Sequence, residues 1–450
     1  MASTSKSVAL AREFTVRILN ELVGSVPLRR LRIRLWDGSY WPDNAAESFV
    51  TTLVLNHPGS LRAMLLGNSE LALGEAYLQN DFDVLGDMEA AFELGDIIRT
   101  QTEGWSKKLK VAHLLRQLPS LPADVEAVRE RRAALDHEQH SPSRDQAAIQ
   151  FHYDLSNDFY ALWLDSRKIY SCAYFQNPAD DLESAQLHKL DTIARKLDLR
   201  PGQRLLDIGC GWGGLILHAA SRYGVQAKGV TLSERQAEYV QKRVCELGLQ
   251  DRVEVLLQDY RAIEGREEYD AVVSVGMVEH VGRKNLPLYF GAVHRLLKPG
   301  GVFLNHGIGT GAVPDLNQGA SFIDEYVFPD GDLFPLPEML TPAEAAGFEI
   351  RDVENLREHY ALTLRHWVSR LETQHDEALK FVSEPVYRTW RLYMAGSVHK
   401  FNLGCLAVYQ MLLAKLDRGG AAKVPLSRAA WYTRKEGAAN DGADASEHPG

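Results

Sequence analysis

One stretch of the sequence carries residue types that suit a nucleotide-binding loop. An apolar run ends at Asp207 and is followed by Gly209, Gly211, Gly213 and Gly214. Glycine adopts positive φ angles and lets the backbone approach a ligand closely. The pattern therefore predicts a buried strand that turns sharply into a helix over a nucleotide-like ligand. Three of the glycines also match the GxGxxG pattern of dinucleotide sites, so the loop alone leaves the ligand open.

Residues near the loop favour S-adenosylmethionine over a dinucleotide. Asp207 lies two residues before the first glycine, where a carboxylate can order the loop and bind the cationic methionine end. A dinucleotide would instead bring an anionic pyrophosphate to the helix N-terminus. The next strand ends without an acid, and Gln236 in the following helix can reach ribose hydroxyls. After the third strand, Asp259 can accept from the adenine amino group and Tyr260 can stack on its ring. The predicted contacts are Asp207, Gly209, Gly211, Gly213, Thr231, Leu232, Ser233, Gln236, Gln258, Asp259 and Tyr260. An NAD-dependent oxidoreductase built on the same loop is the alternative.

A regular alternation of strands and helices begins at residue 204 and positions the loop. The expected strands are 204–208, 226–230, 253–257, 271–275 and 302–305, with helices at 215–223, 234–248 and 286–297 and a tight turn at 298–301. Repeated strand–helix–strand units predict an α/β fold with a doubly wound, mostly parallel sheet.

The rest of the chain predicts further domains. A helix at 7–23, a hairpin at Asp37-Gly38, a strand at 49–55 and a helical stretch from 61 to 94, broken near Gly74 and at 80–83, indicate a small mixed α/β domain over residues 1–100. We expect a charged helical linker at 101–148 and the catalytic domain at 149–417, with an insertion at 315–345 and long helices at 376–416. Residues 418–450, rich in Gly, Ala, Asp and Glu, are expected to be a disordered tail.

Composition narrows the function classes. The net charge of −10 argues against a nucleic-acid partner, because such proteins usually carry a basic face. The four cysteines contain no CxxC pair, which indicates the reducing cytoplasm and neither a zinc site nor a disulfide framework. No apolar run is long enough to span a bilayer, so any membrane contact is expected to be peripheral. Lysines at 107–110 precede an apolar stripe, and arginines follow at 129–132; this segment is either an interfacial helix for anionic lipid or a solvated linker.

Several further motifs flank the loop, at 151–160, 170–175, 229–233, 274–282, 305–309 and 359–367. Over residues 145–415 they resemble the cyclopropane-fatty-acyl-phospholipid synthases and their mycolic-acid relatives. The resemblance implies a seven-stranded Rossmann-like methyltransferase sheet, and a small N-terminal domain like that of the phospholipid-acting branch. It also implies a homodimer that acts on unsaturated phospholipid acyl chains at the inner face of the membrane.

The resemblance implies a reaction as well. Family enzymes transfer the methyl carbon of S-adenosylmethionine to the cis double bond of an acyl chain, and bound bicarbonate is the proposed base that deprotonates the resulting carbocation and closes a cyclopropane ring. An alkene has no proton to remove before it attacks, so the chemistry itself asks for proximity, an apolar slot and stabilisation of a cation. A base is needed only afterwards, close to the new methyl carbon.

The family's site residues fall on matching positions of this sequence. Glu279 matches the carboxylate that orients bicarbonate, and His306 and the backbone of Ile308 match its further ligands. Cys172 matches a lining residue beside the cofactor segment Tyr170-Ser171, and Tyr360 matches a tyrosine that can donate to the anion and face the cation. Each also has a purely structural explanation: a helix cap for Glu279, a strand-end histidine for His306, and buried core residues for Cys172 and Tyr360.

Two departures and two alternatives complete the sequence-based picture. Gly307 stands where bacterial synthases often carry Thr, and Ser397 stands where the family often carries a cysteine, which argues against a covalent thiol step. The nearest alternative is an exomethylene or methyl-branched product from the same cation. Retention of the bicarbonate residues favours ring closure. A non-catalytic lipid-binding module is a further alternative.

Overall fold

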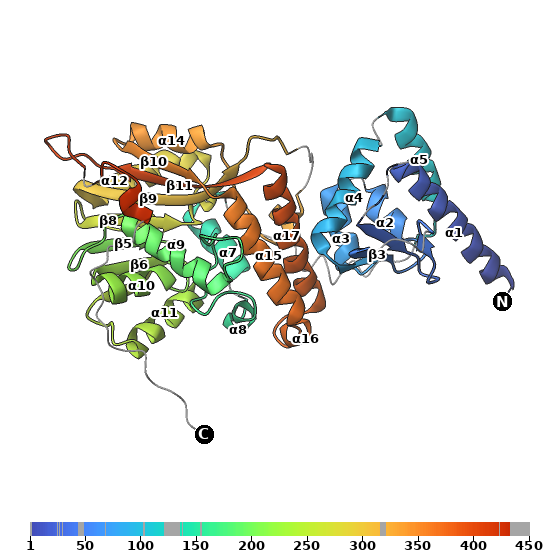
Figure 1. Ribbon diagram of the computed structural model, residues 1–450, viewed down its shortest axis with the longest axis horizontal. Helices are drawn as coiled ribbons and strands as arrows, with labels where there is room; N and C mark the ends of the chain where they lie inside the picture. Colours follow the sequence, from blue (N-terminus) through green and yellow to red (C-terminus); the bar gives the residue numbers. More distant parts are fainter. Residues whose placement is uncertain are drawn as a thin grey trace, which may run out of the picture.

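A seven-stranded sheet lies at the centre of the catalytic part of the chain (Figure 1). The computed structural model describes residues 2–432 apart from 25, 27, 29, 44–48, 68, 102–103, 121–135, 137, 154, 316–320 and 423. The strand order is β10-β11-β9-β8-β5-β6-β7. The strands are β5 (Arg204–Ile208), β6 (Gln226–Thr231), β7 (Val253–Leu257), β8 (Tyr269–Val275), β9 (Leu297–Thr310), β10 (Glu349–Asn355) and β11 (Leu406–Ala414). β11 runs antiparallel to its two neighbours, β9 and β10, and the other pairings are parallel, which confirms the predicted mostly parallel, Rossmann-like sheet.

Helices cover both faces of this sheet. In Figure 1, α12 and α14 lie on one side of it, and α9, α10 and α11 lie on the other. Successive residues of β5 alternate between the two cores: Leu205 packs with the α9–α11 side and Leu206 with the α12–α14 side. Strands buried on both faces read as continuous apolar runs, which is why the sequence showed them clearly. The helices of this part are α7 (Pro142–Tyr153), α8 (Asn157–Ala161), α9 (Leu182–Lys196), α10 (Gly214–Tyr223), α11 (Glu234–Glu246), η1 (Tyr260–Ala262), η2 (Val278–His280), η3 (Arg283–Asn285), α12 (Leu286–Leu296), α13 (Phe322–Tyr326), α14 (Leu336–Ala345), α15 (Arg357–Thr373), α16 (His375–Ala378), α17 (Glu384–Leu403) and α18 (Ala429–Tyr432).

The predicted strands and helices between residues 204 and 305 all form, but the end of the sheet differs from the prediction. The segment 298–301, expected as a tight turn, is part of the long strand β9, whose pairing with β8 shifts register near its start. The segment 376–416 is not helical throughout, because α17 ends at the left-handed Gly404 and β11 follows. An apolar run such as Leu406–Ala414 lacks the period-two alternation that distinguishes a strand from a buried helix.

The N-terminal domain is built on a four-stranded sheet of order β2-β1-β3-β4. Its elements are α1 (Ala2–Val23), β1 (Leu31–Arg34), β2 (Tyr40–Trp41), β3 (Thr51–Leu55), α2 (Ser60–Leu66), α3 (Glu70–Leu78), β4 (Phe82–Gly86), α4 (Met88–Gln101) and α5 (Trp105–Gln117). The antiparallel hairpin expected at Asp37-Gly38 forms. Helix α3 passes through Gly74 without the expected break, and the ring of Phe322 from α13 takes the space that a side chain there would need.

Two segments pack more firmly than the sequence suggested. The apolar stripe Val111, Leu114 and Leu115 of α5 is buried against α1 and α2, so the packed N-terminal domain reaches Leu118 instead of ending near residue 100. Trp431 of α18 is buried against α9, so a disordered tail does not begin at residue 418. The arginines at 129–132 and residues 433–450 lie outside the described residues.

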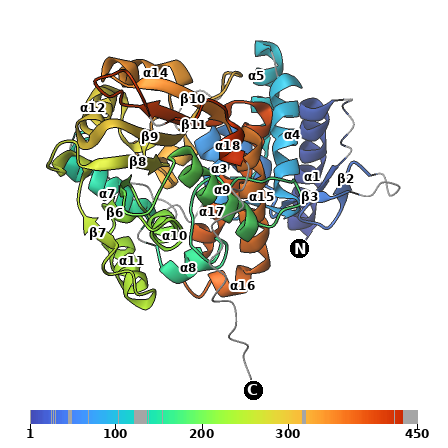
Figure 2. The ribbon, with the colours of Figure 1, turned by 60° about the vertical axis from the view of Figure 1, so that its left-hand side comes forward.

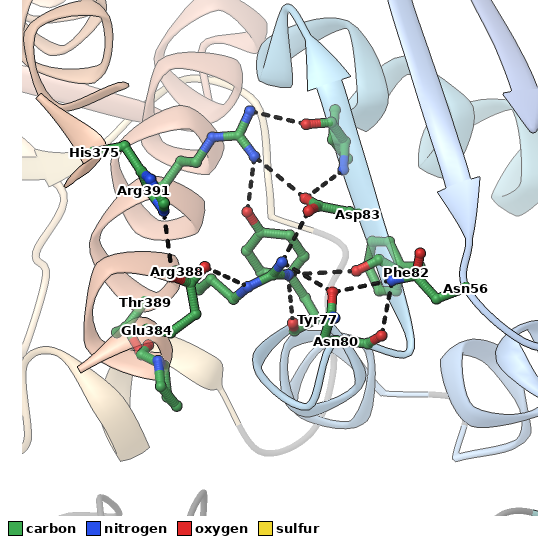
Figure 3. A network of polar contacts seen from close by, with 12 residues as sticks. Asn56, Tyr77, Asn80, Phe82, Asp83, His375, Glu384, Arg388, Thr389 and Arg391 are labelled. Atoms are coloured by element: carbon green, nitrogen blue, oxygen red, sulfur yellow. Dashed lines mark hydrogen bonds and ion pairs between the residues drawn. The ribbon is translucent and has the colours of Figure 1, made fainter. Parts of the chain in front are cut away.

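The two domains meet along α17, which lies with α15 between them in both views (Figures 1 and 2). Figure 3 shows Arg388 and Arg391 reaching from α17 toward the N-terminal domain. Arg388 donates to Asp83 at 2.8 Å, and Arg391 donates to the hydroxyl of Tyr77 at 2.8 Å. Both arginines are buried, and each also pairs with a carboxylate of the catalytic domain, Arg388 with Glu384 and Arg391 with Glu372. None of the described helices combines the length and apolar character needed to cross a membrane.

Candidate active site

The glycine loop opens a cleft at the C-terminal ends of β5, β6, β7 and β8. Gly209 and Gly211 have φ angles of 81° and 54°, the left-handed region that glycine adopts without strain. Between them and α10, Trp212 donates its indole N–H to Asn157 of α8 at 2.8 Å, which ties the loop to the motif at 151–160. Parallel strands bring their carboxyl ends to one edge of a sheet, where α/β proteins bind ligands.

Most of the predicted cofactor residues line this cleft. Those that do are Tyr170, Ser171, Asp207, Gly209, Gly211, Thr231, Leu232, Gln236, Gln258, Asp259 and Tyr260. Gly213 and Ser233 do not. Gly213 begins α10 with a φ of 79°, and a side chain there would meet Val240. Ser233 is buried and caps α11 by accepting from the backbone N–H of Gln236. Both therefore shape the loops that form the cleft.

Two buried titratable side chains, Asp207 and Lys189, form part of the cleft wall. Burial raises the pKa of Asp207 to about 7, against the opposing effect of the ammonium group of Lys189. Burial lowers the pKa of Lys189 to about 8, and its Nζ donates to Ser171 Oγ at 2.8 Å. The sequence analysis missed Lys189. Its signal was a lysine on the apolar stripe of α9, beside Leu182 and Ala185, where a solvated lysine has no place.

Asp259 has a partner of its own in the structure. Arg261 donates to both of its carboxylate oxygens, from Nε at 2.9 Å and from Nη2 at 2.5 Å. Arg261 also contacts Asp145 of α7 at 3.0 Å. The acid expected to face an adenine amino group is thus held in place by an arginine, and its remaining lone pairs are the ones open to a ligand.

A second group of buried side chains does not line the cleft. It consists of Cys172, Glu279, His306 and Tyr360, and we call it the Glu279 group. Met277 and His280, on either side of Glu279, line the cleft, whereas Glu279 itself is buried behind them. Glu279 Oε1 accepts from the backbone N–H of Ile308 at 2.6 Å. Its Oε2 is buried and has no hydrogen-bond partner among the described residues. Burial raises the pKa of Glu279 to about 7, opposed by the bond from Ile308. The Ile308 N–H, expected to hold an anion, is therefore engaged by Glu279.

His306 lies on β9, two residues before Ile308, whose backbone N–H binds Glu279. A Cβ added at the adjacent Gly307 would lie 3.8 Å from the carboxyl carbon of Glu279, which shows how close the two segments run. The side chain of His306 is buried, with Nδ1 3.1 Å from Nε2 of Gln410. Burial and the nearby charges of Lys189 and Lys196 hold the pKa of His306 well below its usual range. The imidazole is neutral at physiological pH.

Cys172 and Tyr360 complete the group. Burial raises the pKa of the Cys172 thiol, and its sulfur lies 3.3 Å from the carbonyl oxygen of Ala173, so the residue is a neutral thiol and not a nucleophile. Tyr360 of α15 packs its ring on Phe401. Burial raises the pKa of Tyr360, and the nearby Tyr393, Cys172 and Glu279 add to the rise. The structure therefore brings Tyr360 into the neighbourhood of Cys172 and Glu279.

Aromatic rings fill the space between the cleft and α17. The ring of His152 stacks on that of Phe328 with their centroids 3.9 Å apart, and its centroid lies 4.9 Å from that of Trp390. Burial lowers the pKa of His152 to about 3. Tyr170, which lines the cleft, lies 5.8 Å from Trp390. Tyr170 was a predicted cofactor residue, whereas His152, Phe328 and Trp390 were not named as site residues. Their elements are far apart in the chain, and only the fold brings them together.

Comparison with known proteins fits this geometry. Residues 140–411 match the family model described as mycolic acid cyclopropane synthetase. The chain belongs to this family. A protein of Pseudomonas putida named "Probable fatty acid methyltransferase" is 39% identical over 405 residues, which cover 89% of this chain and 96% of that protein. The cyclopropane-fatty-acyl-phospholipid synthase of Escherichia coli K12 is 42% identical over 264 residues, covering 59% of this chain and 66% of the synthase.

Solved structures of the cyclopropane synthetase family share the catalytic fold. Mycolic acid cyclopropane synthase CmaA1, complexed with SAH and CTAB, superposes with a TM-score of 0.57 at 36% identity, over 60% of this chain and 98% of that one. The protein is thus an S-adenosylmethionine-dependent methyltransferase of this family. This overturns the alternatives of an NAD-dependent oxidoreductase and of a non-catalytic lipid-binding module. The resemblance of the N-terminal domain to that of phospholipid-acting enzymes stays a prediction.

Proposed function

We propose that the protein transfers the methyl carbon of S-adenosylmethionine to the cis double bond of an unsaturated phospholipid acyl chain and closes a cyclopropane ring. The observation that carries this proposal is the buried Glu279 Oε2, which has no hydrogen-bond partner among the described residues. A buried acceptor of this kind is costly unless a ligand pairs with it.

Bicarbonate suits this place. It can donate one hydrogen bond to Glu279 and accept from neutral donors, and His306 and Tyr360 are both held in their neutral, hydrogen-bearing forms by burial. The cofactor, when bound, supplies an electrophilic methyl group. The chain's own residues exclude water, hold the anion and surround the alkene with ring faces that stabilise a developing cation.

The direct test uses purified protein, S-adenosylmethionine and vesicles of cis-monounsaturated phospholipid. We expect a mass gain of one CH₂ on the acyl chain in the wild type and in Glu238→Gln, a control at an exposed position. Glu279→Gln should give little product. The absence of product from the wild-type protein with its cofactor bound would remove the proposal.

A second product has a specific observation in its favour. The relative that spans most of this chain is named as a fatty acid methyltransferase, not as a cyclopropane synthase. An exomethylene chain arises from the same cation when a hydride shift moves the charge to the methyl-bearing carbon before the added methyl group loses a proton. A methyl-branched alkene arises when the proton leaves from the acyl chain instead. Exomethylene and cyclopropane products have the same mass, so NMR of product made with ¹³C-methyl cofactor must decide between an sp² and a ring carbon.

Contact with the inner face of the membrane is a further part of the proposal. On α5, Trp105 is 84% exposed and Leu109 is 66% exposed, and they lie beside Lys107 and Lys108. Exposed aromatic and aliphatic side chains among lysines suit an anionic lipid surface. The apolar stripe named in the sequence analysis faces inward instead, so the outward residues are a different set.

Charge reversal tests this contact. Lys107→Glu with Lys108→Glu should weaken binding to anionic vesicles, and the loss should be larger at low salt because screening shortens the reach of the charges. Lys242→Glu, which lies on exposed α11 of the catalytic domain, is the control. If the double variant bound vesicles as well as the wild type does, α5 would have only a structural role and the proposed lipid contact would be wrong. The homodimer stays a prediction that sedimentation would test.

A further inference from the structure

A row of polar side chains crosses the sheet and ends at His306. Gln410 on β11 pairs in register with His306 on β9 on one side and with Glu354 on β10 on the other. Paired residues of neighbouring strands place their side chains on the same face. Lys196, the last residue of α9, reaches this face and is almost fully buried. The active-site histidine is thus linked to a lysine that does not line the cleft.

The contacts of Lys196 fix the orientation of the Gln410 amide. Lys196 Nζ lies 2.8 Å from Gln410 Oε1 and 2.5 Å from Glu354 Oε2. An ammonium group can only donate, so the amide must turn its oxygen toward Lys196 and its nitrogen toward His306. Gln410 Nε2 then donates to His306 Nδ1 over 3.1 Å.

This donation decides the tautomer of His306. A neutral imidazole that accepts at Nδ1 carries its proton at Nε2, because which nitrogen is protonated is set by the bond that the other makes. The ammonium groups of Lys189 and Lys196 oppose a second proton on the ring. With Nδ1 occupied and Nε2 protonated, the ring has no lone pair left for a proton from the substrate.

We infer that Lys196 and Gln410 are positioning residues that lock His306 as an Nε2–H donor, so that His306 holds an anion and does not act as the base. The part of this inference that concerns the anion rests on the proposed function. The tautomer itself follows from the described contacts alone. The proton lost from the substrate therefore goes to another acceptor in the Glu279 group, and not to His306.

The sequence carried a weak signal for this row. Gln410 is the lone polar residue in the middle of the apolar strand β11, and Lys196 lies seven residues after Lys189 on the buried side of α9. A structural explanation would make the row only a buried ion pair between α9 and β10. The stability of such an ion pair would not depend on which nitrogen of His306 carries the proton. The tautomer of His306 therefore distinguishes the two explanations.

The test is ¹⁵N NMR of the full chain labelled at histidine, with the His306→Asn variant used to assign the signals. We expect wild-type His306 to show a protonated Nε2 and an unprotonated Nδ1. In Gln410→Glu, whose carboxylate can only accept, the proton should move to Nδ1. A wild-type His306 that is protonated at Nδ1 would overturn the inference, whether or not the protein forms a cyclopropane.

A kinetic measurement adds a second readout. Gln410→Leu removes the bond to Nδ1 and should lower kcat by roughly 10–100-fold, the loss seen when a supporting hydrogen bond to a metal-binding histidine is removed. Affinity for S-adenosylhomocysteine should stay unchanged. The matched control is Gln226→Leu, at an exposed position of β6, and thermal melts verify that each variant is folded. A kcat of Gln410→Leu equal to that of the control would contradict a positioning role, and the wild-type NMR result stands even if a variant fails to fold.

Discussion

The cofactor cleft and the Glu279 group are neighbours that are built in different ways. The cleft uses short contiguous segments at the ends of parallel strands, such as Asp207 to Gly211, and its glycines adopt the positive φ angles that the sequence implies. The Glu279 group joins η2, β9 and α15, and its support comes from α9 and β11. The first is a property of local backbone chemistry, whereas the second exists only once the sheet is complete.

The difference has a functional meaning. The cleft is lined mainly by segments at the ends of neighbouring parallel strands, while the Glu279 group depends on side chains from elements that are distant in the chain. Variants of the two regions should therefore separate cofactor binding from chemistry.

The largest expected effect is on turnover in Glu279→Gln. General acid–base groups contribute roughly 10²–10⁴-fold to rate, so kcat should fall by an amount in that range. The affinity for S-adenosylhomocysteine, measured by calorimetry, should persist, because Glu279 is buried behind the cleft wall. If Glu279→Gln lost cofactor affinity by the same factor as kcat, the cofactor cleft and the Glu279 group would not be functionally separate.

Asp207→Asn should give the opposite pattern. A hydrogen bond to a charged group contributes about 1.5–3 kcal/mol, so cofactor affinity should fall roughly 10–100-fold. The kcat at saturating cofactor should change far less than it does in Glu279→Gln. Calorimetry and saturation kinetics on the same sample measure both quantities, and a large loss of kcat with unchanged affinity would reverse our assignment of the two regions.

The pH dependence of stability probes the buried carboxylate. The pKa of Glu279 is raised from 4.5 to about 7 by burial. Between those pH values the folded chain keeps a proton that the unfolded chain releases, so this group makes the wild type less stable as pH rises. Glu279→Gln has no carboxyl group to titrate, so its stability does not fall in this way. Its free energy of unfolding should therefore rise by on the order of 1–3 kcal/mol relative to that of the wild type across that window.

Denaturant unfolding at pH 5 and pH 7.5 measures this gain, and Glu238→Gln again serves as the control. A difference between variant and wild type that does not change with pH would mean that Glu279 is ionised in the folded protein.

The smallest effect is expected for Cys172→Ala. Its thiol is neutral and buried, and the site needs no nucleophile, so kcat should fall by less than about 10-fold, which is at most about 1.4 kcal/mol of transition-state stabilisation. The kcat of Cys172→Ala should be measured in the same assay as that of Glu279→Gln, so that the two losses can be compared directly. A loss as large as that of Glu279→Gln would restore the thiol as a reacting group.

The same contrast explains what the sequence could predict. The strands of the parallel sheet and most cleft residues follow from apolar runs and glycine spacing, which act locally. Glu279, His306 and Tyr360 were found through a family resemblance, because nothing local marks them as partners. Lys189, Lys196 and Gln410 were missed, since a lone polar residue in an apolar pattern gains a role only from what the fold places opposite it.

The central claim is that bicarbonate, held by the Glu279 group, is the base that removes a proton from the transferred methyl group. It is tested most directly with S-adenosylmethionine whose methyl group carries three deuterium atoms, by mass spectrometry of the acyl product. We predict that the product keeps only two of them, because one leaves as the ring closes. A product that keeps all three deuterium atoms would show that the proton leaves from the acyl chain, and would contradict the account.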